Sequence, residues 1–571
     1  MIERMTRYDF ILLSGQKEEF IRELGTLGVM DITRSFKPVD EKSRDIMSRL
    51  EAVKAEIRRI SKGTDAHLQE LKAARSELFR ESESLVHWGE YDRARLDSLG
   101  IPVNFYCVSD KSFDKAWEEE YPLEVLDTAK GKTWFVVFGE AKLPLAPLPA
   151  PSMSIGEAEA LLARKDAEIE DYRKQLEDLK GSLPALKEQE SALAAELSRY
   201  LAGIGGEKAA DGALTVFEGF APESEKERLA AAFDNMSCVW TSSEATVEDN
   251  PPIKLRNNKF VKQFETLTDM YGRPDYNEFD PTPYLSVFFL LFFAMCMGDA
   301  GYGLVLIIGG ILLKKVEGMK KLAPLVTILG VGTFVVGIVM HTFFGVDISA
   351  LPWIPSWLKA VMITGTIAGF EAQMVLSLAI GVIHLCLAMV VKTVYATRNR
   401  GFLGSLGIWG WTLLIVGGVV VGALAMFSLL PPEVTKWIII GLGVVSAMGI
   451  FLFNDINRNP LKNIGSGLWE TYNTVTGLLG DVLSYLRLYA LGLAGGMLGN
   501  AFNSIAAMTL GDGSFGIGWL AFVLILVIGH ALNLAMCCLG AFVHPLRLNF
   551  LEFFKNSGYD GRGRQYRPIG N

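Results

Sequence analysis

Residues 481–496 read DVLSYLRLYALGLAGG and place Arg487 inside a long apolar stretch. An arginine stays protonated at any ordinary pH, and placing it at the centre of a membrane helix costs about 2.5–3.5 kcal/mol. A second arginine, Arg547, lies in the last apolar stretch, GAFVHPLRLNFLEFF at residues 540–554. Two such charges predict a path for ions or protons through a membrane domain. The alternative is that both arginines snorkel to the membrane surface or form structural ion pairs.

The 571 residues divide into two unlike parts. Residues 1–280 are rich in charge and predict a soluble domain, whereas residues 281–571 are mostly apolar and predict a membrane domain. The net charge of −9 argues against nucleic acid as a partner. The first ten residues, MIERMTRYDF, lack the apolar core of a signal peptide, so we expect the N-terminus to stay in the cytoplasm.

The sequence carries no pattern that is typical of a metal or nucleotide site. The six cysteines are scattered without paired zinc spacing, and the six histidines form no HExxH cluster. No GxxxxGK[ST] loop is present in the chain. We therefore expect no metal, no cofactor and no nucleotide hydrolysis by this chain itself.

The soluble part is predicted to hold two small α/β lobes on a long helical hairpin. One lobe combines strand and helix patterns within residues 5–34 and 215–243, and the other lies within 103–140. Between the lobes, heptad repeats of apolar residues run out over 46–85 and back over 162–197. Antiparallel pairing would bury both apolar seams, so we expect a coiled-coil strut, with a kink at Pro184.

About eight membrane spans of roughly 20 apolar residues are predicted in the second part. They lie near residues 283–298, 300–313, 322–345, 371–396, 406–430, 437–453, 466–508 and 518–555. The last two are too long for a perpendicular crossing, which predicts strongly tilted helices. Most loop lysines and arginines follow even-numbered spans, so both termini are expected in the cytoplasm. The expected fold is mainly α, with a cytoplasmic strut and lobes followed by a polytopic membrane domain.

Small and polar residues follow one face of each of the last two spans. In the seventh span these are Glu470, Asn473, Gly477, Gly480, Ser484 and Arg487, with Asp481 beside them. In the eighth they are His530, Asn533, Cys537, His544 and Arg547. Such stripes could line a wet path or could only let the helices pack closely. Packing explains the glycines, but it gives no reason to bury a permanent charge, so for the arginines we favour the ion path.

Three stretches resemble one known family. They are residues 251–303, which begin PPIKLRNN and end GDAGYG, the run LSYLRLYALGLAGG, and the run HPLRLNFLEFF. Together with the order of strut and spans, they are similar to the large membrane stator subunit of rotary V/A-type ATPases. This is subunit I in prokaryotes and subunit a in eukaryotes. The chain lacks the longer insertions of eukaryotic members, so the resemblance implies a prokaryotic plasma membrane.

The resemblance implies an activity and a set of partners. In that family the last two spans lie against a rotating ring of proteolipid subunits, each with a buried carboxylate, and the two family arginines match Arg487 and Arg547. It implies two half-channels that couple H⁺ or Na⁺ movement to ATP synthesis or hydrolysis. The other implied partners are peripheral stalks, a central-stalk adaptor, the catalytic ATPase head and the lipid bilayer.

The chain departs from eukaryotic members at three channel positions, where it has Asn473, Gly495 and Cys537 in place of a glutamate, a histidine and a glutamate. The half-channel candidates are therefore the remaining polar groups of the two spans, Glu470, Asn473, Asp481, Ser484, His530, Asn533 and His544. We expect the early seventh span to face the cytoplasmic half-channel and the early eighth span the outer one. A stand-alone transporter or channel with a coiled-coil regulatory domain is the competing hypothesis, although no inverted repeat of broken helices supports it. A purely structural tether would leave both arginines unexplained.

Overall fold

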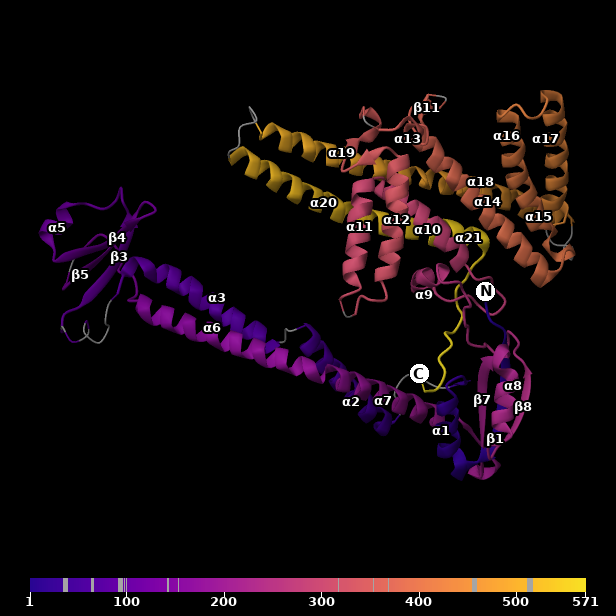
Figure 1. Ribbon diagram of the computed structural model, residues 1–571, viewed down its shortest axis with the longest axis horizontal. Coiled ribbons are helices and arrows are strands. Elements are labelled where there is room, and N and C mark those ends of the chain that lie inside the picture. The colour runs from indigo at the N-terminus through magenta and orange to yellow at the C-terminus, as the bar shows by residue number, and fades with distance from the viewer. Residues whose placement is uncertain are drawn as a thin grey trace. The chain divides into compact units, whose positions relative to one another are not determined.

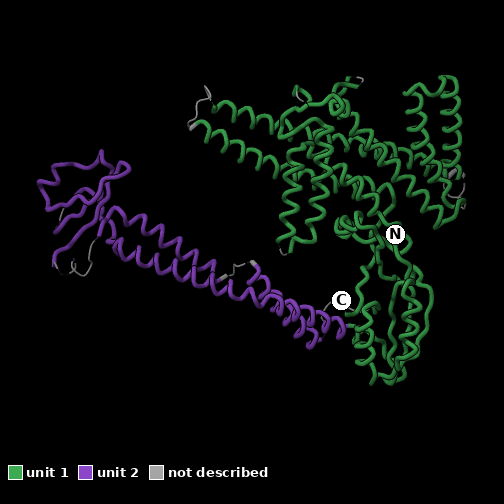
Figure 2. The backbone as a smooth tube through the Cα atoms, viewed as in Figure 1, with its two compact units in different colours: residues 1–34, 202–571 green, residues 35–201 purple. Residues whose placement is uncertain are grey.

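The protein is described by a computed structural model that covers residues 1–33, 40–62, 66–90, 96, 98, 100–140, 143–151, 153–316, 318–352, 354–367, 369–453, 460–510 and 517–570. Its contacts divide the chain into two compact units, shown in Figure 2. Unit 1 joins residues 1–34 to residues 202–571, and unit 2 comprises residues 35–201. The two halves of the first lobe, far apart in sequence, therefore lie together in unit 1.

The lobe of unit 1 is an antiparallel sheet with two helices. The strands are β1 (Met5–Leu13), β2 (Asp31–Ile32), β6 (Glu207–Ala209), β7 (Leu214–Pro222) and β8 (Val239–Glu244), in the order β2-β7-β1-β8 with β6 also on β7. In β1, alternate residues Tyr8, Phe10 and Leu12 are buried, as the period of a half-buried strand predicts. They share an apolar core with α1 (Lys17–Leu27) and α8 (Lys226–Phe233). The predicted strand-helix-strand pattern is confirmed here.

The C-terminal segment adds to this same lobe, which the sequence patterns did not predict. Ile569 is fully buried in the lobe's core, and its backbone N–H donates to Met30 O at 2.9 Å. The Tyr566 hydroxyl donates to the Val29 carbonyl, and the Arg567 N–H donates to the Asp31 carboxylate at 2.8 Å. The chain after the last apolar helix is therefore fastened to this lobe.

The apolar half of unit 1 consists mainly of helices (Figure 1), with two short hairpins, β9–β10 (Thr342–Phe343 and Val346–Asp347) and β11–β12 (Thr366–Ile367 and Phe370–Glu371). Five are long and apolar enough to span a membrane, namely α14 (Ala372–Arg400), residues 403–426, residues 432–452, residues 463–508 and residues 518–557. Three shorter apolar helices are α10 (Thr282–Met297), α11 (Ala300–Leu313) and α12 (Ala323–Val339). The eight apolar segments match the predicted positions, and three are shorter than a full span.

The two last segments are each interrupted. Residues 463–508 divide into α18 (Pro460–Ser484) and α19 (Leu486–Met508). Residues 518–557 comprise most of α20 (Ile517–Arg547), the π-helix η11 (Leu548–Phe553) and α21 (Phe554–Ser557). In Figure 1, α19 and α20 run side by side, and α10 packs against both through an apolar core that includes Phe289, Phe292 and Leu488. This core holds the two helices that carry the arginines.

Unit 2 is a helical hairpin with a small sheet at one end. The outgoing helices are α2 (Glu41–Lys62) and α3 (Ala66–Leu85), and the returning helices are α6 (Ile155–Asp178) and α7 (Leu183–Ile204). Buried seam residues Leu68, Ile169 and Leu176 join α3 to α6, and Arg75 pairs with Asp166 across them at 2.8 Å. The helix break lies at the 3₁₀ turn Leu179–Ser182, just before Pro184.

The distal lobe of unit 2 has three strands, one more than predicted. β3 (Val103–Ser109), β4 (Leu123–Ala129) and β5 (Lys132–Phe138) form an antiparallel sheet in the order β3-β5-β4. The edge strand β4 is mostly exposed, so it lacks the apolar alternation that revealed the other two.

Candidate functional site

Arg487 lies directly after the break between α18 and α19. Tyr485 forms the break, because its backbone makes two tight i→i+3 hydrogen bonds of 3.1 Å, to Val482 O and from Leu488 N. Arg487 is half-buried, and its enclosed Nη1 has no hydrogen-bond partner. It forms no ion pair with any residue that the structure describes. A half-buried guanidinium without an acid partner is energetically costly.

Arg547 ends α20 and is exposed, and within the described ranges it has no hydrogen bond or ion pair. Pro545 lies inside α20, where it removes a helical N–H, and the chain widens into the π-helix η11 directly after Arg547. The charges of both arginines act on the His544 ring, whose enclosed Nδ1 has no hydrogen-bond partner among the described residues. Both arginines therefore border irregular helix turns, and both act electrostatically on His544.

An acidic cluster lies toward the end of α18 and on η11 and α21. Asp481 is 16% exposed, accepts a hydrogen bond from Asn556 Nδ2 at 2.8 Å and lies 3.7 Å from Lys555 Nζ. Glu552 is buried, and its enclosed Oε2 has no hydrogen-bond partner in the described structure. The two carboxylates act on each other electrostatically, and Glu552 also feels the charge of Arg547. We call Asp481, Ser484, Glu552, Lys555 and Asn556 the acidic cluster.

A second polar group joins α20 to α11 and α19 on the other side of Arg487. His530 bonds through one ring nitrogen to the Tyr302 hydroxyl and through the other to Asn503 Oδ1, each at 2.9 Å. Asn533 is buried and donates to the Tyr302 hydroxyl at 2.8 Å and to Gly495 O at 2.9 Å. These predicted candidates are thus held in one hydrogen-bonded network.

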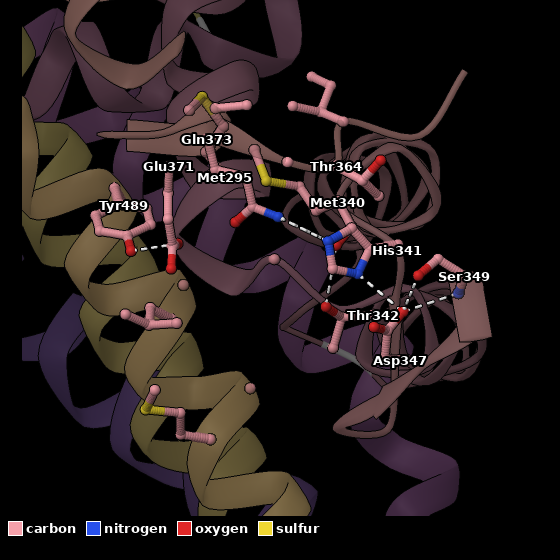
Figure 3. Close-up of a pocket in the computed structure, with 18 of the residues that line it drawn as sticks. Met295, Met340, His341, Thr342, Asp347, Ser349, Thr364, Glu371, Gln373 and Tyr489 are labelled. Atoms are coloured by element: carbon pink, nitrogen blue, oxygen red, sulfur yellow. Dashed lines mark hydrogen bonds and ion pairs between the residues drawn. The ribbon is translucent and has the colours of Figure 1, made fainter. Parts of the chain in front are cut away.

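A cavity of about 530 Å³ lies beside the same stretch of α19, one turn beyond Arg487. We call it the loop cavity, because most of its polar wall comes from residues 340–373 (Figure 3). In Figure 3 the Glu371 carboxylate points toward the Tyr489 hydroxyl, which donates to it at 2.5 Å. His341 lies 3.1 Å from the Asp347 carboxylate and 3.3 Å from Gln373 Nε2. This polar space reaches the helix turn that carries Arg487.

The charge of Asp347 in this wall is held by its neighbours. Burial alone would raise the pKa of the Asp347 carboxyl, but hydrogen bonds from Ser349 and the nearby His341 lower it below its usual value. The loop cavity therefore keeps a negative charge at neutral pH. Within the described residues, no cluster of His, Cys, Asp and Glu side chains is arranged to hold a metal ion.

The structure brings some predicted residues together and separates others. Asp481 and Ser484 lie in the acidic cluster, His530 and Asn533 lie in the second network, and His544 is close enough to both arginines for their charges to act on it. Glu470 and Asn473 are exposed on α18. The glycines Gly492, Gly495 and Gly499 pack closely against Met295, Cys537 and Gly345, as a packing role predicts. At Gly477 and Gly480, on the polar stripe of α18, no such close contact exists among the described residues.

Several residues of the site were missed by sequence reasoning. Glu552 could have been found as the one acid in its apolar run, and Asp299 as the acid within the GDAGYG turn. Asp299 is buried and accepts four backbone N–H groups, from α11 and from the loop after α12. Glu371 and Tyr489 carry no sequence signal, because their contact joins residues that lie 118 positions apart. His341, expected inside a span, lies beyond the end of α12 in a loop.

Comparison with known proteins bears on the identity of this site. The family model described as "V-type ATPase 116kDa subunit family" matches residues 208–335. The A-type ATP synthase subunit I of Methanocaldococcus jannaschii is 33% identical over 62% of this chain and 54% of that protein, so the match spans about half the length of this relative. The V-type ATP synthase subunit I of Chlamydia pneumoniae is 26% identical over 91% of this chain and 86% of that protein. That of Borreliella burgdorferi is 23% identical over 100% and 99%.

These relatives confirm the resemblance to subunit I of A- and V-type ATP synthases. This chain is mainly helical, and five of its helices are long and apolar enough to cross a bilayer.

Proposed function

We propose that this relative of subunit I is the membrane stator subunit of a V/A-type rotary ATPase or ATP synthase, in which Arg487 faces the carboxylates of a rotating proteolipid ring. The observation that carries the proposal is that both arginines lack an acidic partner among the described residues, although each lies in a long apolar helix. A ring carboxylate from another subunit would supply the missing partner.

The proposed mechanism is electrostatic. A ring carboxylate that carries an ion or proton is neutral and can face lipid. When it reaches Arg487, the positive charge favours the ionised carboxylate, so the ion or proton leaves into one half-channel. A new ion or proton then binds from the other half-channel, and the ring subunit moves on. Arg487 and Arg547 also repel a cation that would pass directly between the half-channels.

The acidic cluster would form the cytoplasmic half-channel. Asp481 lies on α18 and Glu552 on the π-helix η11, and the charges of Glu552 and Arg547 act on each other. The loop cavity would form the outer half-channel, with Glu371 and Tyr489 beside the helix turn of Arg487 and the His530 network as its inner wall. Glu470 and Asn473 are proposed only as exposed residues near the cytoplasmic opening.

The rest of the chain would connect this channel to the catalytic head. Residues 1–280 would form the cytoplasmic domain, with the hairpin of unit 2 as a coiled-coil strut that binds peripheral stalks and approaches the central-stalk adaptor. Residues 281–571 would form the membrane domain of eight spans, with strongly tilted last helices and both termini in the cytoplasm of a prokaryotic cell. The exposed lysines at residues 314, 315, 320 and 321 support this orientation.

The proposal is tested by reconstitution in liposomes. The purified complex should move H⁺ or Na⁺ when ATP is added, and this chain should purify together with a proteolipid ring. The chain alone should produce no ion flux, because the carriers belong to the ring. Flux through the purified chain without a ring would instead favour a stand-alone transporter. Comparing ATPase rates with and without Na⁺ in the same complex identifies the ion.

A further inference from the structure

His384 is a buried histidine that the proposed ion path does not use. It lies in the middle of α14, is fully buried, and its Nδ1 is 2.9 Å from the Tyr485 hydroxyl. Its Nε2 is enclosed and has no hydrogen-bond partner in the described part of the chain. The ring stacks on Phe553 at 4.7 Å and 6°, and Phe288 lies 4.1 Å away. Burying an imidazole among aromatic rings with one ring nitrogen unpaired costs free energy, which suggests that this histidine has a specific role.

The neighbours of His384 mark the two irregular helix turns of the site. Tyr485 is the residue at the break between α18 and α19, two positions before Arg487. Phe553 is the last residue of the π-helix η11, which begins directly after Arg547. One side chain on α14 therefore contacts the irregular turn beside each arginine.

The surface of α14 beside Tyr485 leaves room for the Tyr485 ring to reach His384. Gly381, one turn before His384, lies so close that an added Cβ would come within 2.3 Å of the Tyr485 ring. The Tyr485 ring and its hydroxyl are therefore held from α14 by a bare backbone and by one hydrogen bond. A leucine at position 384 could fill the space, but it would leave the buried hydroxyl of Tyr485 without a partner.

We propose that His384 is a positioning residue: it fixes the break at Tyr485 and the π-helical turn at Phe553, and so sets where Arg487 and Arg547 stand relative to the ring. This inference rests on the proposed stator function. Misplacing a reacting group by about 1 Å can cost on the order of a hundredfold in rate. The contacts of His384 with Tyr485 and Phe553 would thus affect transport without any contact between His384 and the ion.

The experiment compares His384→Leu, His384→Gln and Tyr485→Phe in the intact complex, with Arg487→Ala as reference. ATP-driven transport is measured per assembled complex, so a loss of assembly is scored separately. We expect His384→Leu to lower transport at least roughly tenfold, and His384→Gln, whose amide can bond to the tyrosine hydroxyl, to restore most of it. The double variant His384→Leu with Tyr485→Phe should transport no worse than His384→Leu alone, because both remove the same hydrogen bond.

Gly381→Ala provides an independent check, because it displaces the Tyr485 ring without altering His384. It should also lower transport per assembled complex. If His384→Leu fails to assemble, Tyr485→Phe and Gly381→Ala carry the test. Normal transport per complex in these variants, with Arg487→Ala inactive, would overturn the positioning role and leave the stator function standing. Transport by Arg487→Ala would overturn the stator function itself.

Discussion

The two polar regions on either side of Arg487 are built in different ways. The acidic cluster belongs to helices, and its Glu552 is almost fully enclosed with one oxygen unpaired. The loop cavity is walled largely by residues 340–373, and its Glu371 is exposed to a space of about 530 Å³. We infer that the first region depends on single, fixed side chains, whereas the second can hold water that bridges several polar groups.

The largest effect that tests this comparison is expected at Glu552. Glu552→Gln keeps the shape of the side chain but removes the negative charge that interacts with Asp481 and, more weakly, with Arg547. We expect ATP-driven transport to fall at least roughly tenfold, as for the loss of a proton-transfer group. Glu433→Gln, an exposed acid on α17 (Pro432–Ala447), is the matched control. Transport within about twofold of the unaltered complex would show that Glu552 is structural.

A smaller effect is expected in the loop cavity. Glu371→Gln removes a carboxylate, but Asp347, His341 and the space for water remain. Transport should therefore fall by only about two- to fivefold, less than for Glu552→Gln. The same Glu433→Gln control applies. A loss as severe as that of Glu552→Gln would break the comparison, because it would make Glu371 as indispensable as an enclosed group.

The sequence was informative about one region and silent about the other, for a physical reason. Helical spacing placed Asp481 and Ser484 on one span, and the structure keeps them near each other and near Glu552. The eight apolar segments were visible as continuous apolar runs, and most strands and helices of the lobes as periodic patterns. No period reveals the contact of Glu371 with Tyr489, or that of His384 with Tyr485, because each joins side chains more than 100 positions apart. The contact of the C-terminal segment with the first lobe was hidden in the same way.

The smallest expected effect concerns which side of the membrane gives a reagent access to each polar region, rather than transport activity. In a chain whose six cysteines are replaced, Met497→Cys introduces a thiol into the wall of the loop cavity, and Lys555→Cys one beside Asp481. A membrane-impermeant maleimide added outside should label position 497 and not 555. Added from the cytoplasmic side, it should label 555 and not 497. Labelling of both positions from one side would place the two regions on a single face of the membrane.

The central claim, that Arg487 is the fixed charge that acts on ring carboxylates, is tested most directly by ATP-driven ion transport in the assembled complex with Arg487→Ala. Arg400→Ala, an exposed arginine at the end of α14, is the control. We expect the Arg487→Ala variant to assemble with the ring and the catalytic head but to transport no ions, while the Arg400→Ala variant transports normally. Sustained ATP-driven transport by assembled Arg487→Ala complexes would contradict it.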